Sequence, residues 1–90
     1  MHYEWDESKR VANFAKHGMD FIAAEQFEWA AAIEAMDNRC DYGEERWVAL
    51  GFIGNRLHVL IYTRRKESIR LISLRRANSR EREYYEKTQA

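Results

Sequence analysis

Two alternating runs joined by a two-residue turn constrain the fold more than any other feature of this chain. Within residues 46–53 and 57–63, apolar side chains recur at every second position, which is the period of a β-strand. Gly54 and Asn55 stand between the runs, and such a link joins twisted antiparallel strands. A third apolar run, residues 68–75, follows the polar link 64–67. The sequence therefore predicts a three-stranded antiparallel meander.

Shorter helix and strand signals flank this meander. They are a short strand at 3–5, a helix over 8–17, a second helix from Asp20 to about Phe27, a strand at 32–37, a polar loop over 37–43 and a helix starting at 78–81. Asp6 or Ser8 can cap the first helix, and Gly18 can end it. The prediction is one α+β domain over residues 1–90, with two N-terminal helices packed on an antiparallel β-sheet of three to five strands and with a C-terminal helix.

The first helix carries an apolar stripe, and both faces of the last two strands carry apolar side chains. The stripe consists of Val11, Ala12, Phe14 and Ala15. An antiparallel sheet with one face in water alternates more cleanly than these strands do. We therefore expect the C-terminal helix or a partner to cover the second face. Asn78 and Glu81 form a capping box for that helix, and Tyr84 and Tyr85 are its only large apolar side chains.

Composition limits the classes of function. The net charge is zero, but residues 1–63 hold six Lys/Arg against eleven Asp/Glu, and residues 64–90 hold nine against four. A basic C-terminal block indicates either a phosphate-binding surface or internal charge pairing. The start of the chain resembles no signal peptide, and no apolar run is long enough for a membrane span, so we expect a cytoplasmic protein. One cysteine, Cys40, excludes an internal disulfide.

Arginines gather in and around the last strand. They are Arg64, Arg65, Arg70, Arg75 and Arg76. Simple alternation places Ile69, Leu71, Ser73 and Arg75 on one face, and Arg70, Ile72, Leu74 and Arg76 on the other. Guanidinium groups bind phosphate oxygens bidentately and could stabilise a pentacoordinate phosphorane. Alternatively, these arginines pair with Glu44, Glu45, Glu81 or Glu83 and only stabilise the fold.

A second polar group lies on the first predicted helix. Lys9, Asn13, Lys16 and His17 fall close to one face of it. A histidine with a pKa near neutrality could serve as general base or acid for attack by a ribose 2′-hydroxyl, or it could simply cap the helix. His58 lies inside a strand and is interpreted as structural, and Cys40 has no nearby base. Phosphate loops, zinc patterns, paired carboxylates and nucleophile elbows are missing from the sequence, so we expect no metal and no cofactor.

Three segments of the chain resemble the signatures of the BrnT toxins. The opening segment runs from Trp5 to Gly18 with Phe21 following, the central one from Tyr42 to Gly51, and the closing one from Thr63 to Ala77 with Glu81 and Tyr85 downstream. They occur in order and at the family's spacings. The chain departs from many relatives at Leu74, at Asn78 and in the link 64–67.

The resemblance implies a RelE-like fold and a metal-independent endoribonuclease that inhibits growth. It also implies a neighbouring BrnA-like antitoxin that neutralises the toxin and binds operator DNA. On this basis we expect catalysis from Arg70, Arg75, His17 and Lys9, and RNA binding from Arg65, Arg76, Arg64 and Tyr85. Cleavage would leave a 2′,3′-cyclic phosphate. The alternative is a module that binds nucleic acid or antitoxin without catalysis.

Overall fold

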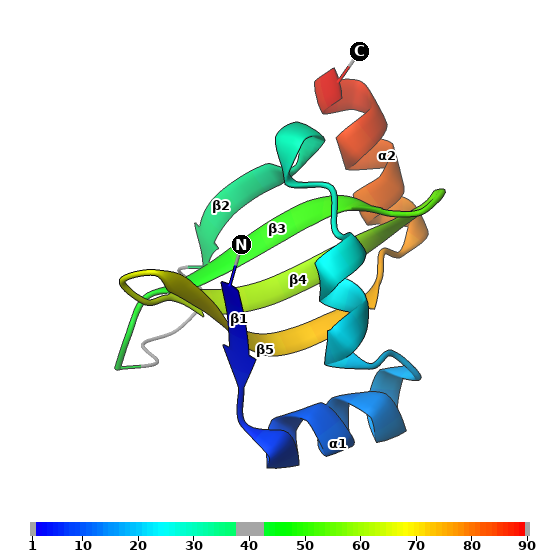
Figure 1. Cartoon of the computed structure of the whole chain (residues 1–90). Helices are drawn as coiled ribbons and strands as arrows, with labels where there is room; N and C mark the ends of the chain where they lie inside the picture. Colours follow the sequence, from blue (N-terminus) through cyan, green and yellow to red (C-terminus); the bar gives the residue numbers. More distant parts are fainter. Residues whose placement is uncertain (1, 38–42, 90) are drawn as a thin grey trace.

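The computed structural model describes residues 2–37 and 43–89 (Figure 1). Its elements are β1 (His2–Trp5), α1 (Glu7–His17), the 3-10 segments η1 (Phe21–Gln26) and η2 (Trp29–Ala31), β2 (Ile33–Asp37), β3 (Arg46–Ile53), β4 (Arg56–Arg64), β5 (Ser68–Arg76) and α2 (Ser79–Gln89). Cys40 and Tyr42, which entered the sequence argument, lie outside the described residues.

The five strands form one sheet in the order β1-β5-β4-β3-β2. The predicted meander is confirmed, because β3, β4 and β5 pair antiparallel in sequence order. Gly54 turns the first hairpin with a φ of 62°, a conformation that costs glycine little. The sheet as a whole is mixed, since β1 runs parallel to β5. More than sixty residues separate these two strands, so no hairpin forces them to be antiparallel.

A bulge in β5 overturns the simple alternation expected there. Ile61 pairs with Ser73, but the next residue, Tyr62, pairs with Leu71, so that Ile72 is the extra residue. Paired residues in an antiparallel sheet share a face. Ile69, Leu71, Leu74 and Arg76 therefore lie on one face, and Arg70, Ser73 and Arg75 lie on the other. The bulge thus brings Arg70 and Arg75 to the same face.

The N-terminal helix is built as predicted, but the second helical segment is not an α-helix. Asp6 caps α1 by accepting from the Ser8 amide at 2.9 Å, and Gly18 ends the helix in the left-handed conformation. Asp20 caps the next segment as expected, but η1 and η2 are 3-10 turns. The buried residues Phe21, Ala24 and Phe27 stand three positions apart, and that spacing is the period of a 3-10 helix, not of an α-helix.

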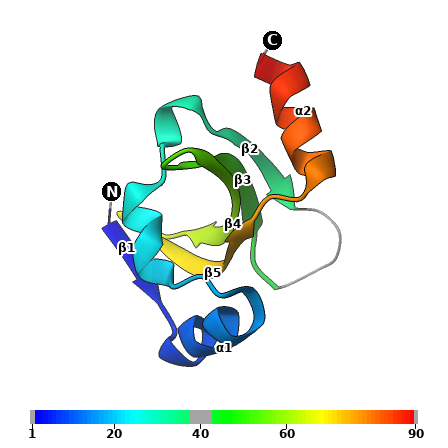
Figure 2. The ribbon, with the colours of Figure 1, turned by 90° about the vertical axis from the view of Figure 1, so that its right-hand side faces the viewer.

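Two apolar clusters fill the two faces of the sheet. On one face η1 packs against the middle of the sheet, and this cluster contains Phe21, Ala24, Phe27, Ala49, Leu60, Tyr62, Ile69, Leu71 and Leu74. On the other face Tyr85 of α2 joins Leu50, Leu57, Val59 and Ala77. The expectation that the C-terminal helix covers the second face is confirmed for this part of it. Figure 2 shows the curved sheet with η1 and α2 on opposite sides.

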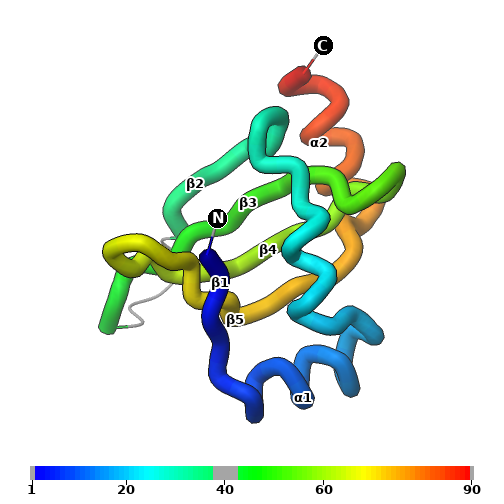
Figure 3. Tube along the Cα trace, viewed as in Figure 1, coloured from blue at the N-terminus to red at the C-terminus, as the bar shows by residue number. Residues whose placement is uncertain are grey.

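The first helix packs along the edge of β5 beyond β1, with its polar side inward (Figure 3). Asn13 is 6% exposed, whereas Val11 and Phe14 of the predicted apolar stripe are 62% and 55% exposed. The Asn13 amide group donates to the Leu74 carbonyl at 2.8 Å and accepts from the Leu74 amide at 3.1 Å. It thus occupies the place that a neighbouring strand would take beside β5, and this role in the fold explains its burial.

Candidate nucleic-acid interface

The two arginines predicted to stabilise a transition state already contact carboxylates. Both Nη atoms of Arg75 donate to Glu81, each at 2.8 Å, in a bidentate pair. Arg70 approaches Glu4 of the neighbouring strand β1, with 3.8 Å between Nη1 and Oε1, which is too long for a hydrogen bond. The structural alternative considered for the arginine cluster therefore applies to Arg75, while Arg70 keeps its hydrogen-bond donors more accessible.

The four predicted catalytic residues fall into two groups at opposite ends of α1. At the N-terminal end, the pKa of Asp6 is lowered, first by hydrogen bonds from Ser8 and then by the charges of Arg70 and Lys9. Arg70 and Lys9 therefore lie near one another. His17 lies eight residues beyond Lys9, a rise of about 12 Å along a helix. It belongs with Arg75 at the other end of β5.

A surface cavity of about 480 Å³ brings together four basic side chains at that second end. Lys16 and His17 come from the last turn of α1, and Arg75 and Arg76 come from the end of β5. Gly18 and Met19 complete the lining. We call this the His17 cavity. It joins a possible proton acceptor to groups that attract phosphate.

The imidazole of His17 is suited to accept a proton. Partial burial lowers its pKa below the ordinary value of 6.5, and the nearby charges of Lys16 and Arg75 lower it further. A histidine whose pKa lies below 6.5 is mostly neutral at pH 7, and a neutral imidazole can act as a general base. The same cations would also attract the negative charge of an RNA phosphate.

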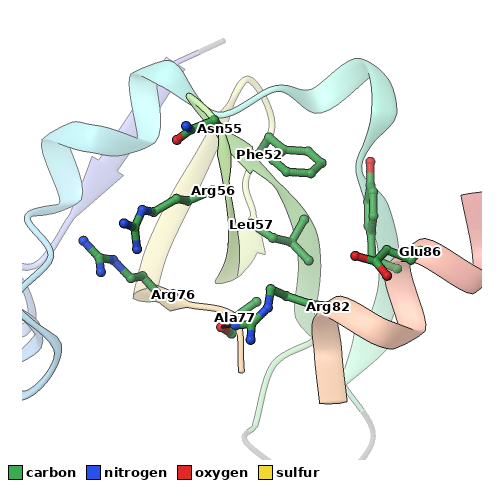
Figure 4. A pocket seen from close by; sticks show the side chains of 9 residues that line it. Phe52, Asn55, Arg56, Leu57, Arg76, Ala77, Arg82 and Glu86 are labelled. Atoms are coloured by element: carbon green, nitrogen blue, oxygen red, sulfur yellow. Dashed lines mark hydrogen bonds between the residues drawn. The ribbon is translucent and has the colours of Figure 1, made fainter. Parts of the chain in front are cut away.

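A second cavity, of about 440 Å³, opens between the start of β4 and α2 (Figure 4). Three arginines line it, namely Arg56, Arg76 and Arg82, together with the apolar side chains of Phe52, Leu57 and Tyr85. We call it the β4–α2 cavity. Because Arg76 lines both this cavity and the His17 cavity, the two adjoin at that residue.

The other predicted RNA-binding arginines lie at the opposite end of β5. Arg64 stacks over the Trp47 ring at 4.3 Å and donates to Glu34 at 2.9 Å. Arg65 is 3.8 Å from Glu4 and 3.7 Å from Glu44, so both of its ion pairs are long. A third cavity, of about 420 Å³, lies beside these two arginines and is separate from the two cavities at Arg76.

Tyr85 contributes chiefly to packing. It is 7% exposed, its hydroxyl donates to the Ala31 carbonyl at 2.7 Å, and its ring meets Phe52 edge to face. Only part of the ring borders the β4–α2 cavity. His58 is structural, as predicted, because it is buried and its Nδ1 lies 2.9 Å from the Arg56 carbonyl.

Sequence reasoning missed Arg56, Arg82 and Phe52. Arg56 follows the predicted turn 54–55 and directly precedes the predicted strand 57–63, and the structure makes it the first residue of β4. The sequence predicted that β4 pairs with β5, but it did not supply the register, which brings Arg76 opposite His58 and diagonal to Arg56. Arg82 joins them only through the position of α2.

The described residues hold neither a metal cluster nor a membrane-spanning helix. In residues 2–37 and 43–89, no three His, Cys, Asp or Glu side chains gather as a metal site would require. No helix in the same residues has the length and apolar character needed to cross a membrane.

The sequence matches a known family model over most of its length. Residues 5–81 match the family model described as "Ribonuclease toxin, BrnT, of type II toxin-antitoxin system". The match includes the last residue of β1, all of α1, the whole meander and the first three residues of α2. A search of curated proteins found no match.

Proposed function

The chain belongs to the BrnT family of ribonuclease toxins of type II toxin–antitoxin systems, and from this premise we propose that it is a metal-independent endoribonuclease acting through the His17 cavity. The ribose 2′-oxygen attacks the adjacent phosphorus, the bond from phosphorus to the 5′-oxygen breaks, and a 2′,3′-cyclic phosphate and a 5′-hydroxyl result. The observation that carries the proposal is the meeting of His17 with Arg75 and Arg76 around one cavity.

His17 takes the proton from the 2′-hydroxyl. Its lowered pKa keeps the imidazole neutral and able to accept that proton. The ammonium group of Lys16, in the same cavity, supplies a proton to the departing 5′-oxygen. This assignment differs from the sequence prediction by using Lys16 in place of Lys9, which lies at the other end of α1.

Arginines stabilise the charge that accumulates on the phosphate. Arg76 is the stronger candidate for contact with the scissile group, because Arg75 shares its charge with Glu81. Arg70 and Lys9 hold a flanking phosphate at the other end of α1. Arg65 and Arg64, at the link between β4 and β5, bind further phosphates of the same RNA.

A type II toxin has an antitoxin partner and an RNA substrate. We propose that the partner here is a BrnA-like protein that blocks the toxin and carries the operator-binding module. We also place both proteins in the cytoplasm, where RNA is accessible. The toxin contacts operator DNA only through this antitoxin.

Purified protein and a short RNA test the reaction. Cleavage with a 2′,3′-cyclic phosphate end is expected for the wild type and for Arg80→Gln, a change on α2 outside both cavities. His17→Asn and Arg76→Gln should each slow cleavage by about two orders of magnitude or more. A 2′-deoxy residue at the cleaved position should abolish it. Full activity in both variants would refute the site, and cleavage of the 2′-deoxy substrate would refute the mechanism.

The pairing of Arg75 with Glu81 favours one alternative, a module that binds RNA or antitoxin without cutting. In that case RNA would be retained in a complex and recovered intact. Growth arrest on induction separates the two in cells. Arg70→Ala and Arg75→Ala should relieve it under either reading, whereas His17→Asn, which removes the proposed base, should relieve it only if cleavage causes the arrest.

A further inference from the structure

We propose that the β4–α2 cavity is a nucleotide subsite for single-stranded RNA, adjoining the His17 cavity. In this subsite Arg56 and Arg76 bind the phosphate, and the wall formed by Phe52 and Leu57 receives the base. This assignment rests on the proposed ribonuclease function and adds a binding site that the sequence did not predict.

Arg56 and Arg76 form a pair of like charges, and no carboxylate of residues 2–37 or 43–89 forms an ion pair with either of them. They lie on one face of the sheet, because Arg76 pairs with His58 and Arg56 stands two residues before His58 in β4. Diagonal neighbours of this kind are within reach of long side chains. Figure 4 shows the two side chains extending side by side.

Electrostatics support the proximity of these two guanidinium groups. Burial is the main cause of the lowered pKa of His58, and the charges of Arg76 and Arg56 lower it further. Among the described residues, neither arginine has an ion pair with a carboxylate within 4.0 Å. Two adjacent guanidinium groups repel one another until an anion binds between them, and a phosphate with three acceptor oxygens fits their paired donors.

The opposite rim adds a third cation that is held in place. Nη1 of Arg82 donates to the Ala77 carbonyl at 3.0 Å, which fixes the guanidinium and leaves its other donors for a ligand. Among the described residues that line the cavity, Glu86 is the one carboxylate. The cavity therefore carries a net positive charge, as an RNA-binding site requires.

The apolar wall is supported by packing and by a hydrogen bond. The Phe52 ring contacts Tyr85 edge to face at 5.4 Å between centroids, and the Tyr85 hydroxyl is fixed on the Ala31 carbonyl. Phe52 itself is only partly buried, so its ring remains accessible. Proteins that bind single-stranded RNA without sequence preference combine an aromatic ring, on which a base stacks, with a basic rim that binds the backbone.

The position of Arg76 makes the nucleotides in the two cavities neighbours in the RNA. Because it lines both cavities, a phosphate bound to it links a nucleotide in the His17 cavity to one in the β4–α2 cavity. The proposed subsite therefore belongs to a neighbour of the cleaved nucleotide and contributes to substrate binding. It takes no part in proton transfer.

Binding of a 2′-deoxy-substituted oligonucleotide, which the proposed reaction cannot cleave, tests the subsite separately from catalysis. Arg56→Gln should weaken binding about tenfold and reduce the salt slope by about 0.7, the value for one lost single-strand phosphate contact. Arg80→Gln is the matched control, because it removes an α2 arginine that does not line the cavity. Thermal melting should show both variants folded.

A series of oligonucleotides with one abasic position each tests the base contact. We expect one position at which loss of the base weakens binding to the wild type. With the oligonucleotide that lacks this base, Arg56→Gln should reduce the affinity by a smaller factor than it does with the complete oligonucleotide. In cleavage assays Arg56→Gln should raise KM, because the subsite contributes to substrate binding. If Arg56→Gln has the affinity and the KM of the wild type while His17→Asn is inactive, the subsite proposal is wrong and the ribonuclease proposal still holds. If the wild type itself does not cleave RNA, the ribonuclease proposal is wrong.

Discussion

Arg75 and Glu81 form a bidentate ion pair that ties the end of β5 to the first turn of α2. The same carboxylate accepts from the Asn78 amide at 2.9 Å, and the Asn78 side chain accepts from the Glu81 amide at 2.8 Å. Glu81 is therefore both half of a capping box and the counter-charge of a candidate catalytic arginine. Its removal should affect stability and RNA binding in opposite directions.

Glu81→Gln is the variant that separates these two roles. The amide can still cap the helix, but it no longer neutralises Arg75, so RNA affinity should rise several-fold at low salt. The free energy of unfolding should fall by about 0.5–1 kcal/mol. Fluorescence anisotropy and urea denaturation measure the two effects. Unchanged RNA affinity would mean that Arg75 serves only the fold.

The pH dependence of this pair has a definite sign. The hydrogen bonds from Arg75 lower the pKa of Glu81 below its ordinary value of 4.5. The stabilisation is therefore complete above that value and is lost as the pH falls through the lower pKa of the folded state. As the pH falls below 4.5, the free energy of unfolding should therefore decrease less in Glu81→Gln than in the wild type.

Asn13 should be more important for stability than the large apolar residue beside it. Asn13→Ala leaves the buried amide and carbonyl of Leu74 without their side-chain partners, at a cost of about 2–4 kcal/mol. Phe14→Ala on the same helix should cost under about 0.5 kcal/mol, because Phe14 is 55% exposed. Urea denaturation of both variants measures the contrast. A larger loss in Phe14→Ala would contradict this packing of α1.

The burial of Asn13 and the exposure of Phe14 show where sequence patterns predict structure correctly and where they do not. The meander, the caps of α1 and α2 and the turn at Gly54 depend on local chemistry, so the sequence predicted them correctly. The inward face of α1 depends on a tertiary contact between Asn13 and Leu74. An apolar stripe at Val11 and Phe14 does not reveal that contact.

The candidate site shows the same division. Its residues on α1 and β5 could be found from residue type and motif, as for His17 and Arg76. The bulge at Ile72 has no sequence mark, yet it decides which arginines share a face. Arg56 and Arg82 become neighbours of Arg76 only through strand register and the docking of α2.

His58 should make the stability of the protein depend on pH. Burial lowers its pKa below 6.5, so the unfolded chain binds a proton more readily than the folded chain does. Stability is then greatest above pH 6.5 and falls as the pH drops through that value. His58→Gln should flatten the melting temperature between pH 7.5 and pH 5.5, as followed by circular dichroism. An equally steep loss in that variant would assign the effect to another group.

Cleavage should lose rate on the acid side through His17. Because burial and the charges of Lys16 and Arg75 lower its pKa, the imidazole stays neutral below the ordinary histidine value. The rate of RNA cleavage should therefore be flat near neutrality and fall tenfold per pH unit only below about 6.5. Single-turnover rates measured where circular dichroism reports folded protein avoid the loss of structure caused by His58. Lys16→Gln removes the proposed proton donor and one of the charges that lower the pKa of His17, so cleavage should slow at every pH and its acid limb should move toward higher pH. A limb that stays in place would exclude His17 as the titrating base.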